Sequence, residues 1–274
     1  MTVAIVTDSA ASLPPELAAA AHVTVVPMGV VIGGTPYRDG ELPLDEVMAR
    51  VGDGVTTSAP TPGQFAEALE RSMGDDGALV LTIAHSMSAT FDAARTGAGL
   101  VGGPARVLDT TTAAGAQGLV VLEAARLAAT GATLDEVEEG ARLAAARVRL
   151  VATVPGLDRL AESGRVPGVA AWAGRWLGLH PMFQFKDGRV RPQLPARSRR
   201  AALDRMAGSL RESRVDGARL RVSALHAAAL EEATALLEAA REIAPPAEEF
   251  VAPFSPVMVA HTGLGLVGLA WWWD

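Results

Sequence analysis

Three short clusters along this chain combine hydroxyl groups, an imidazole and turn-forming residues, the groups from which a polar binding site is built. Residues 260–265 (AHTGLG) carry His261 and Thr262 directly after the apolar stretch 256–259, which we expect to end a strand. Residues 56–62 (TTSAPTP) and 86–90 (SMSAT) each precede a predicted helix. Taken singly, a Ser or Thr in such a position serves as a helix N-cap, because its oxygen accepts a hydrogen bond from an otherwise unpaired backbone N–H.

Taken together, the three clusters indicate a site for an anion. Ligands of open α/β sheets bind outside the carboxyl ends of the strands, and the hydroxyl and N–H groups gathered there at helix starts attract negative charge. No cluster sets a strong nucleophile beside a base, so the sequence favours holding a carboxylate or phosphate over transforming it. The alternative is a small-molecule enzyme for a carboxylated or phosphorylated substrate, with His261 as its acid or base.

Glycine patterns and histidine spacing argue against several other kinds of site. Residues 97–102 and 263–268 both match G-x-G-x-x-G, but neither lies in the complete strand–turn–helix–strand context that a dinucleotide needs. The chain has no G-x-x-x-x-G-K-[ST] and no G-x-S-x-G, the patterns of a phosphate-binding loop and a hydrolase elbow. The five histidines lack metal-ligand spacing, so no metal site is predicted.

Composition narrows the partners and the compartment. A formal net charge of −7 and a pI near 5.3 argue against a nucleic-acid-binding surface. The absence of cysteine excludes a disulfide framework and a thiol nucleophile. Residues 1–6 begin a strand without the pattern of a signal peptide, so we expect a cytoplasmic protein. Residues 251–273 lack charged side chains, but their prolines and glycines predict a buried strand–turn–strand and no membrane insertion.

The order of predicted elements indicates an α/β fold with two domains. Before residue 150, strands end in polar turns that lead into helices, and Thr133 with Glu136 forms a capping box. This part, residues 1–150, is expected to be a three-layer α/β/α domain with a mostly parallel sheet. In residues 151–274 a hairpin signal at 186–189 (KDGR) predicts a mixed or antiparallel sheet. Strands are predicted at 3–6, 23–32, 78–83, 106–108, 150–154, 181–185, 190–193 and 220–225, and Ser12 is predicted to cap the first helix.

Six motifs, in order along nearly the whole chain, resemble those of the DegV family. They are residues 7–9 (TDS), 57–60 (TSAP), 79–91 (the apolar run 79–83 leading to SATF), 107–110 (VLDT), 164–166 (GRV) and 261–265 (HTGLG). The family includes the fatty-acid-binding (FakB-type) subunits of bacterial fatty acid kinase. The resemblance implies a bacterial, non-catalytic lipid carrier without a cofactor, which holds a long-chain, palmitate-like fatty acid in an apolar tunnel between two α/β domains. It also implies a partner, a separate kinase subunit that phosphorylates the carboxylate.

The resemblance further implies roles for particular residues. Thr57 and Ser88 would bind the fatty-acid carboxylate, with Ser58 close by and His261 and Thr262 completing the polar end. Arg165 and Arg197 would contact the kinase or the acyl phosphate.

Three positions depart from the family pattern. Ala89 replaces a glycine, Leu264 replaces a proline, and His180 stands where lysine is frequent. Ala89 raises the question of whether its turn needs a positive φ, which favours glycine.

Overall fold

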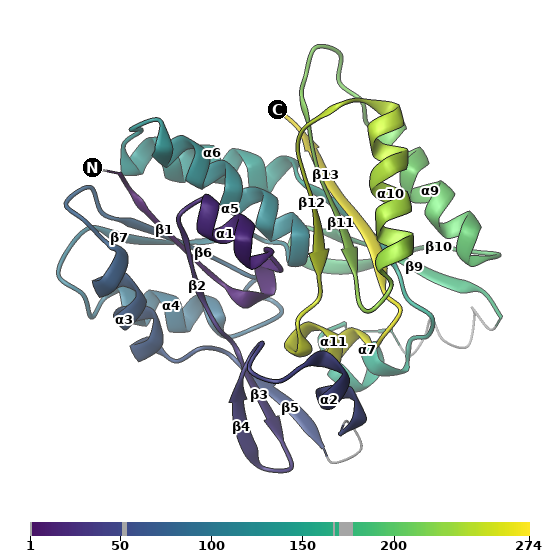
Figure 1. Ribbon diagram of the computed structural model, residues 1–274, viewed down its shortest axis with the longest axis horizontal. Helices are drawn as coiled ribbons and strands as arrows, with labels where there is room; N and C mark the ends of the chain where they lie inside the picture. Colours follow the sequence, from purple (N-terminus) through teal and green to yellow (C-terminus); the bar gives the residue numbers. More distant parts are fainter. Residues whose placement is uncertain (1, 51–53, 167, 170–177) are drawn as a thin grey trace.

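The computed structural model describes residues 2–50, 54–166, 168–169 and 178–274. The first large sheet along the chain is parallel, as predicted. Strands β1 (Ala4–Asp8), β2 (Val23–Val26), β6 (Ala78–Thr82) and β7 (Ala105–Asp109) pair in the order β2-β1-β6-β7, all parallel. Helices α3 (Pro62–Ser72) and α4 (Thr90–Ala98) cover one face, and α5 (Ala114–Ala129) and α6 (Leu134–Arg147) cover the other (Figure 1). The predicted three-layer α/β/α arrangement is therefore confirmed.

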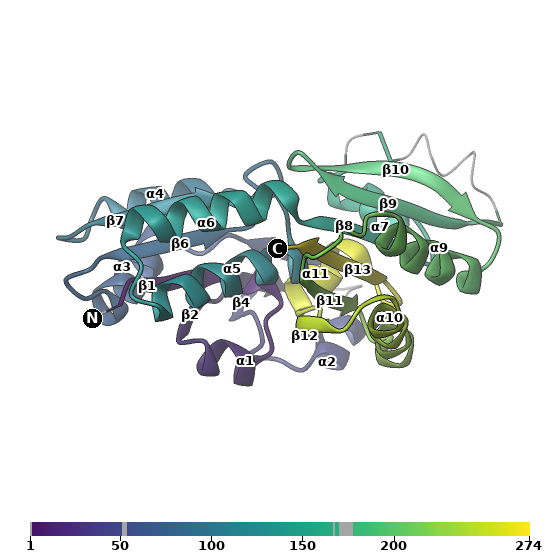
Figure 2. The same cartoon turned by 90° about the horizontal axis from the view of Figure 1, so that it is seen from above.

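The second large sheet is mixed, which confirms the prediction for the later part of the chain. Its order is β10-β9-β8-β13-β11-β12, with β11 and β12 parallel and the other pairs antiparallel. The predicted turn joins β9 to β10, and Asp187 (φ 52°) and Gly188 (φ 73°) adopt the left-handed conformation of a tight hairpin. Helices α9 and α10 pack side by side on the sheet face turned away from α5 (Figure 2). The elements are β8 (Arg149–Thr153), β9 (His180–Lys186), β10 (Arg189–Ala196), α9 (Arg199–Glu212), β11 (Leu220–His226), α10 (Leu230–Ile243), β12 (Pro246–Pro253) and β13 (Val267–Trp273).

A third, smaller sheet was not predicted. Strands β3 (Gly29–Ile32), β4 (Thr35–Arg38) and β5 (Val55–Ser58) form an antiparallel sheet in the order β4-β3-β5, with α2 (Leu44–Ala49) between β4 and β5 in the chain. The sequence suggested one strand over residues 23–32. Pro27 divides that run, because proline supplies no N–H for a sheet ladder, and the two halves join different sheets.

The expectation of a strand–turn–strand over residues 251–273 is wrong, because a short helix, α11 (Pro256–Thr262), lies between β12 and β13. Ser255 at the N-cap and Pro256 in the first turn favour a helix start. Gly263, with φ 76°, ends it. His261 and Thr262 therefore lie at the end of a helix and not of a strand. Within the described ranges, no helix is long and apolar enough to cross a membrane.

The prediction that Ser12 caps the first helix is also wrong. Ser12 follows a single 3-10 turn, Ser9–Ala11, and takes the left-handed conformation (φ 51°) at its end. Helix α1 (Pro15–Ala20) begins later, behind Pro14, without a side-chain cap. Asp8 instead caps the 3-10 turn, by accepting a hydrogen bond from the N–H of Ala10 at 3.0 Å.

Helix α5 joins the two large sheets. It packs against β1 and β6 on one side and against β11, β12 and β13 on the other, and nearly all of its residues are buried, most of them apolar. Gly115 permits the close approach, because a Cβ there would lie 2.3 Å from Ser223 Oγ.

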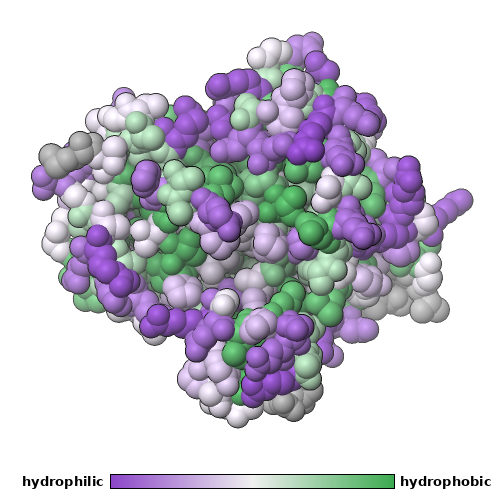
Figure 3. Space-filling view, in the orientation of Figure 1, coloured by the Kyte–Doolittle hydropathy of each residue, from purple (hydrophilic) through white to green (hydrophobic). Residues whose placement is uncertain are grey.

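On the face shown in Figure 3, hydrophobic side chains gather between the two large sheets, while hydrophilic ones dominate the rim. In the described part of the chain, strands from Arg149 onward all belong to the mixed sheet, which supports the boundary near residue 150; the division into domains 1–150 and 151–274 stays a prediction.

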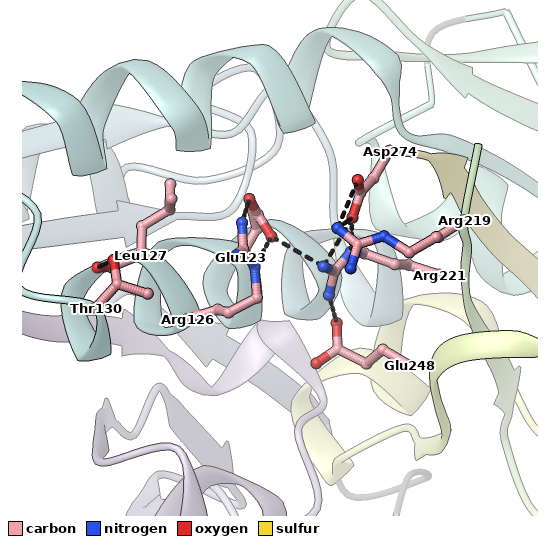
Figure 4. A network of polar contacts seen from close by, with 8 residues as sticks. All are labelled: Glu123, Arg126, Leu127, Thr130, Arg219, Arg221, Glu248 and Asp274. Carbon is pink, nitrogen blue, oxygen red and sulfur yellow. Dashed lines mark hydrogen bonds and ion pairs between the residues drawn. The ribbon is translucent and has the colours of Figure 1, made fainter. Parts of the chain in front are cut away.

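A buried ionic network reinforces the same junction (Figure 4). The guanidinium of Arg221 on β11 is 4% exposed and lies 2.8 Å from Asp274, 3.1 Å from Glu248 and 3.5 Å from Glu123 on α5. It also stacks over the Trp272 ring at 5.6 Å. Since an unpaired buried charge is strongly destabilising, this arrangement fixes α5 against the mixed sheet.

Candidate functional site: an apolar cavity with a hydroxyl–imidazole end

The cavity that contains the predicted site residues has a volume of about 570 Å³. Its walls come from β5 of the small sheet, from the loop between β6 and α4, from the start of α5, from β8 to β11, and from α7 (Asp158–Ser163) and α11. It therefore lies where all three sheets meet, outside the carboxyl end of β6, which is where the topology of an open α/β sheet places a ligand.

Most of the wall is apolar. Buried aromatic and aliphatic side chains from the mixed sheet form one side, and methionines line the parts near the small sheet and α11; examples are Leu150, Phe183, Phe185, Phe254, Met28 and Met258. Polar lining atoms come almost entirely from Ser, Thr and His and from Arg165. A largely apolar space with few polar groups suits a ligand that is mostly hydrocarbon.

Thr57 and His261 are brought together by the fold. The Thr57 hydroxyl oxygen lies 2.7 Å from His261 Nε2, and both residues line the cavity. Thr57 is in β5, paired with Val30 of β3, and His261 is in the last turn of α11. A hydroxyl and an imidazole from opposite ends of the chain thus share one hydrogen bond at the cavity wall.

The electrostatics around His261 favour a neutral ring. Burial, together with the positive charge of Arg165, lowers the pKa of His261 to about 4. At neutral pH the imidazole therefore offers one N–H donor and one acceptor nitrogen. A neutral hydrogen-bonding group results, not an ionic partner for a carboxylate.

The other predicted hydroxyls also line the cavity but are held differently. Ser88 Oγ lies 2.8 Å from Thr90 Oγ1 at the start of α4 and accepts from the Thr90 N–H at 3.3 Å. The Thr262 hydroxyl donates to the Met258 carbonyl at 3.1 Å, so its proton is engaged within α11. Ser58 Oγ lies against Gly29, where a Cβ would be only 2.3 Å from it. The partners of Thr57 and Ser88, an imidazole nitrogen and a hydroxyl, can themselves act as donors, so both hydroxyl protons can turn to a ligand.

The two predicted arginines are in different places. Arg165 follows α7, donates to the Ser163 carbonyl at 2.5 Å, and is the one lining residue in the described ranges with a permanent positive charge. Arg197 lies on the surface between β10 and α9, and it is not part of the described cavity wall. Only Arg165 is thus placed to act on a group bound inside.

The two loop departures fit the backbone as it stands. Ala89 has φ −70°, so this turn does not need the left-handed conformation that favours glycine. Leu264 is 44% exposed and sits between Gly263 and Gly265, which take the positive φ values themselves. The Gly265 N–H donates to the Ala227 carbonyl at 2.7 Å, so the loop is fixed without a proline.

Sequence reasoning missed residues that hold these loops. The Ser86 hydroxyl donates to the Gly188 carbonyl at the β9–β10 turn, and the Gly188 N–H donates to the Thr111 carbonyl at 3.1 Å. Asp109 accepts from the His85 N–H at 3.2 Å and from the Thr111 N–H at 2.8 Å. The contact of Asp109 with Thr111 is a local turn, but the others join segments that are distant in the chain, so no local pattern predicts them. Among the described residues, no three acidic, His or Cys side chains are grouped to hold a metal ion.

Comparison with known proteins decides the family. The profile described as "Uncharacterised protein, DegV family" matches residues 2–273. The chain belongs to the DegV family. A DegV domain-containing protein of Streptomyces coelicolor is 35% identical, with 97% of each chain covered. One from Mycobacterium tuberculosis is 33% identical over 98% of this chain and 96% of its own.

Solved structures of DegV proteins share the whole fold. A structure described as fatty acid binding of a DegV family protein, from Thermus thermophilus, has a TM-score of 0.91 at 31% identity and covers 100% of both chains. DegV of Bacillus subtilis, described as a fatty acid binding protein, has a TM-score of 0.87 at 26% identity, again over 100% of both. A DegV lipid binding protein of Thermotoga maritima has a TM-score of 0.86 at 27% identity, over 100% of this chain and 99% of that one.

Proposed function

We propose that this DegV protein is a cytoplasmic carrier of a long-chain fatty acid. The observation that carries the proposal is the cavity itself, a largely apolar space with hydroxyls and a neutral imidazole in its wall. The relatives described as fatty-acid-binding support it, because they share this fold over the full chain. In the proposal, Thr57 and Ser88 bind the carboxylate directly, His261 completes the polar end through its hydrogen bond to Thr57, and Ser58 and Thr262 lie at the edge of the same region.

Burial of the hydrocarbon chain supplies most of the affinity. A sixteen-carbon acid has about fourteen methylenes, and at about 0.8 kcal/mol each their transfer from water is worth on the order of 11 kcal/mol. The loss of translational and rotational freedom removes several kcal/mol of this. The polar groups then set the orientation of the acid and add the affinity that distinguishes a carboxylate from an uncharged end.

The hydrogen-bond donors can be assigned a direction. A carboxylate only accepts hydrogen bonds, so the Thr57 hydroxyl must donate to it and cannot also donate to His261. His261 would then carry its proton on Nε2 and donate to Thr57, whose oxygen lies 2.7 Å away. Arg165, which already influences His261 electrostatically, would balance the negative charge. His261 thus donates to Thr57 and Thr57 donates to the carboxylate, and each hydrogen bond in this chain strengthens the next.

We further propose that the bound acid is presented to a separate kinase subunit. A carrier needs no chemistry of its own. An imidazole with a pKa of about 4 is unprotonated at neutral pH, so it is a poor general acid there, and its low pKa also makes it a weak general base. For this reason the enzyme hypothesis, with His261 as acid or base, is not favoured. Arg165 at the cavity and exposed Arg197 are the proposed contacts to the kinase or to the acyl phosphate.

Titration with matched ligands tests the binding role. Palmitate, its methyl ester and hexadecanol present the same hydrocarbon but different polar ends, so the proposal expects palmitate to bind most tightly, by about tenfold or more. Equal affinity for all three would contradict a carboxylate site.

The kinase role is tested separately, by following acyl phosphate formation from protein-bound palmitate with a fatty acid kinase subunit. Arg197→Ala should slow acyl phosphate formation without changing palmitate affinity.

A further inference from the structure

Helix α11, which carries His261 at its end, is held at its start by a residue from the other end of the chain. Asp39 Oδ1 accepts a hydrogen bond from the Val257 N–H at 3.1 Å, across 218 residues of sequence. Asp39 Oδ2 in turn accepts from the Ser9 hydroxyl at 2.6 Å, and Ser9 Oγ accepts from the Met28 N–H at 3.1 Å. Both carboxylate oxygens of Asp39 are therefore engaged, and the side chain is fixed in direction.

The helix has a cap residue of its own that it does not use. Ser255 occupies the N-cap position, but its hydroxyl makes no cap hydrogen bond, and among the described residues Ser255 Oγ has no partner at all although it is buried. A Ser at this position normally accepts from the second or third N–H of its helix. Here the second N–H, that of Val257, is taken by Asp39. Since Ser255 could cap the helix by itself, the Asp39 contact has a further effect, which is to attach the start of α11 to a residue beside the small sheet.

The small sheet sets the distance between the two anchors of α11. Arg38, directly before Asp39, pairs with Gly29 of β3, and Gly29 pairs on its other side with Ser58, directly after Thr57. Neighbouring strands lie about 4.8 Å apart, so β4 and β5 are separated by about 10 Å. A seven-residue helix is also about 10 Å long. α11 thus lies between Asp39 at its start and Thr57 at its end, both presented by one sheet.

We infer that Asp39 is a positioning residue for the carboxylate site, which acts by fixing α11 so that His261 meets Thr57. The expected effect of Asp39 on ligand binding rests on the proposed fatty-acid function, whereas its expected effect on the position of α11 does not. With Asp39 removed, Ser255 can accept from Val257 and keep the helix formed, while α11 loses the hydrogen bond that joins its start to the residue after β4. The loss of Asp39 should then lower the affinity for the ligand more than the stability of the fold, because a polar site tolerates displacements of only about 0.5 Å.

The test compares Asp39→Ala and Asp39→Asn with Thr133→Ala, which removes a helix cap on α6 outside the cavity wall. Asp39→Ala should weaken palmitate binding by about tenfold or more, while its melting temperature falls no further than that of Thr133→Ala. Asp39→Asn keeps an oxygen acceptor for Val257 and should restore affinity. Palmitate affinity close to wild type in Asp39→Ala, or a loss equal in Asn and Ala, would overturn the inference.

A ligand-free measurement separates this inference from the proposed function. The imidazole signals of the chain, assigned with His261→Gln, report the pKa of His261 by NMR without any fatty acid. In Asp39→Ala that pKa should move upward from about 4 toward that of an exposed histidine, and Thr133→Ala should leave it unchanged. An unmoved pKa overturns the positioning role even if palmitate binds, whereas a wild-type protein that binds no palmitate refutes the proposed function alone.

Discussion

The imidazole of His261 and the hydroxyl of Thr57 lie 2.7 Å apart although 204 residues separate them in sequence. One belongs to a helix between two strands of the mixed sheet and the other to the small antiparallel sheet. The contact therefore depends on the packing of α11 against the small sheet, which makes the polar wall of the cavity a product of tertiary structure.

Removing the Thr57 hydroxyl should weaken fatty-acid binding without unfolding the protein. Thr57→Val keeps the shape and the strand preference of the side chain, so the main loss is one donor to the carboxylate, worth about 1.5–3 kcal/mol for a charged acceptor, or roughly ten- to hundredfold in affinity. Thr56→Val, at the neighbouring exposed position of β5, is the matched control and should bind normally. Isothermal titration with palmitate decides between them. Equal affinities in the two variants would remove Thr57 from the site.

His261 should make the protein less stable in mild acid. The folded-state pKa of about 4 lies below the usual value of 6.5, so between these two values the unfolded chain binds more protons than the folded one. Stability then rises with pH through this window and is lost as pH falls. The difference in free energy of unfolding between wild type and His261→Gln, measured in urea from pH 4 to 7, should change in that direction. A difference independent of pH would contradict a buried, neutral imidazole.

Asp8 should have the opposite effect in nearly the same window. Burial raises the pKa of Asp8 from 3.8 to about 6, against the lowering effect of hydrogen bonds such as the one from the Ile83 N–H. The folded protein therefore binds the proton more tightly, and its stability falls as pH rises from about 4 to about 6, by about 3 kcal/mol. Asp8→Asn does not titrate, so wild type should lose stability relative to it over this range. A constant offset between the two unfolding curves would show that Asp8 titrates normally.

Arg221 should be far more important for stability than its neighbour Arg219. The Arg221 side chain is 4% exposed and the Arg219 side chain 63%, although both contact Asp274. Arg221→Ala removes the buried cation that Glu248 and Glu123 share, leaving Glu123 with Arg126 as its remaining ion pair, and should lower the free energy of unfolding by about 3–5 kcal/mol. Arg219→Ala removes a surface ion pair and should change it by at most about 1 kcal/mol. Similar losses in the two variants would mean that the network in Figure 4 does not anchor α5.

Local patterns predicted the elements that local physics determines. The capping box at Thr133, the left-handed hairpin turn at Asp187 and Gly188, and the fully buried strand at 78–82 all appear as expected. Each depends on neighbours within a few residues. The parallel sheet followed from the regular alternation of such strands with helices.

The errors arose where several weak local signals competed. Residues 251–273 are apolar enough to predict a strand pair with His261 at a strand end, but Ser255 and Pro256 favour a helix start within this segment, and the helix forms. The division of residues 23–32 between two sheets depends on which partners the halves find, which no local pattern encodes. The role inferred for Asp39 is of the same kind, because its partners lie 30 and 218 residues away.

Extraction of the purified protein with organic solvent, followed by mass spectrometry, tests the central claim most directly. Protein produced in bacteria should release close to one equivalent of long-chain fatty acid, and Thr57→Val with Ser88→Ala should release clearly less. If wild type yields no stoichiometric fatty acid and binds none when palmitate is added, the protein is not a fatty-acid carrier.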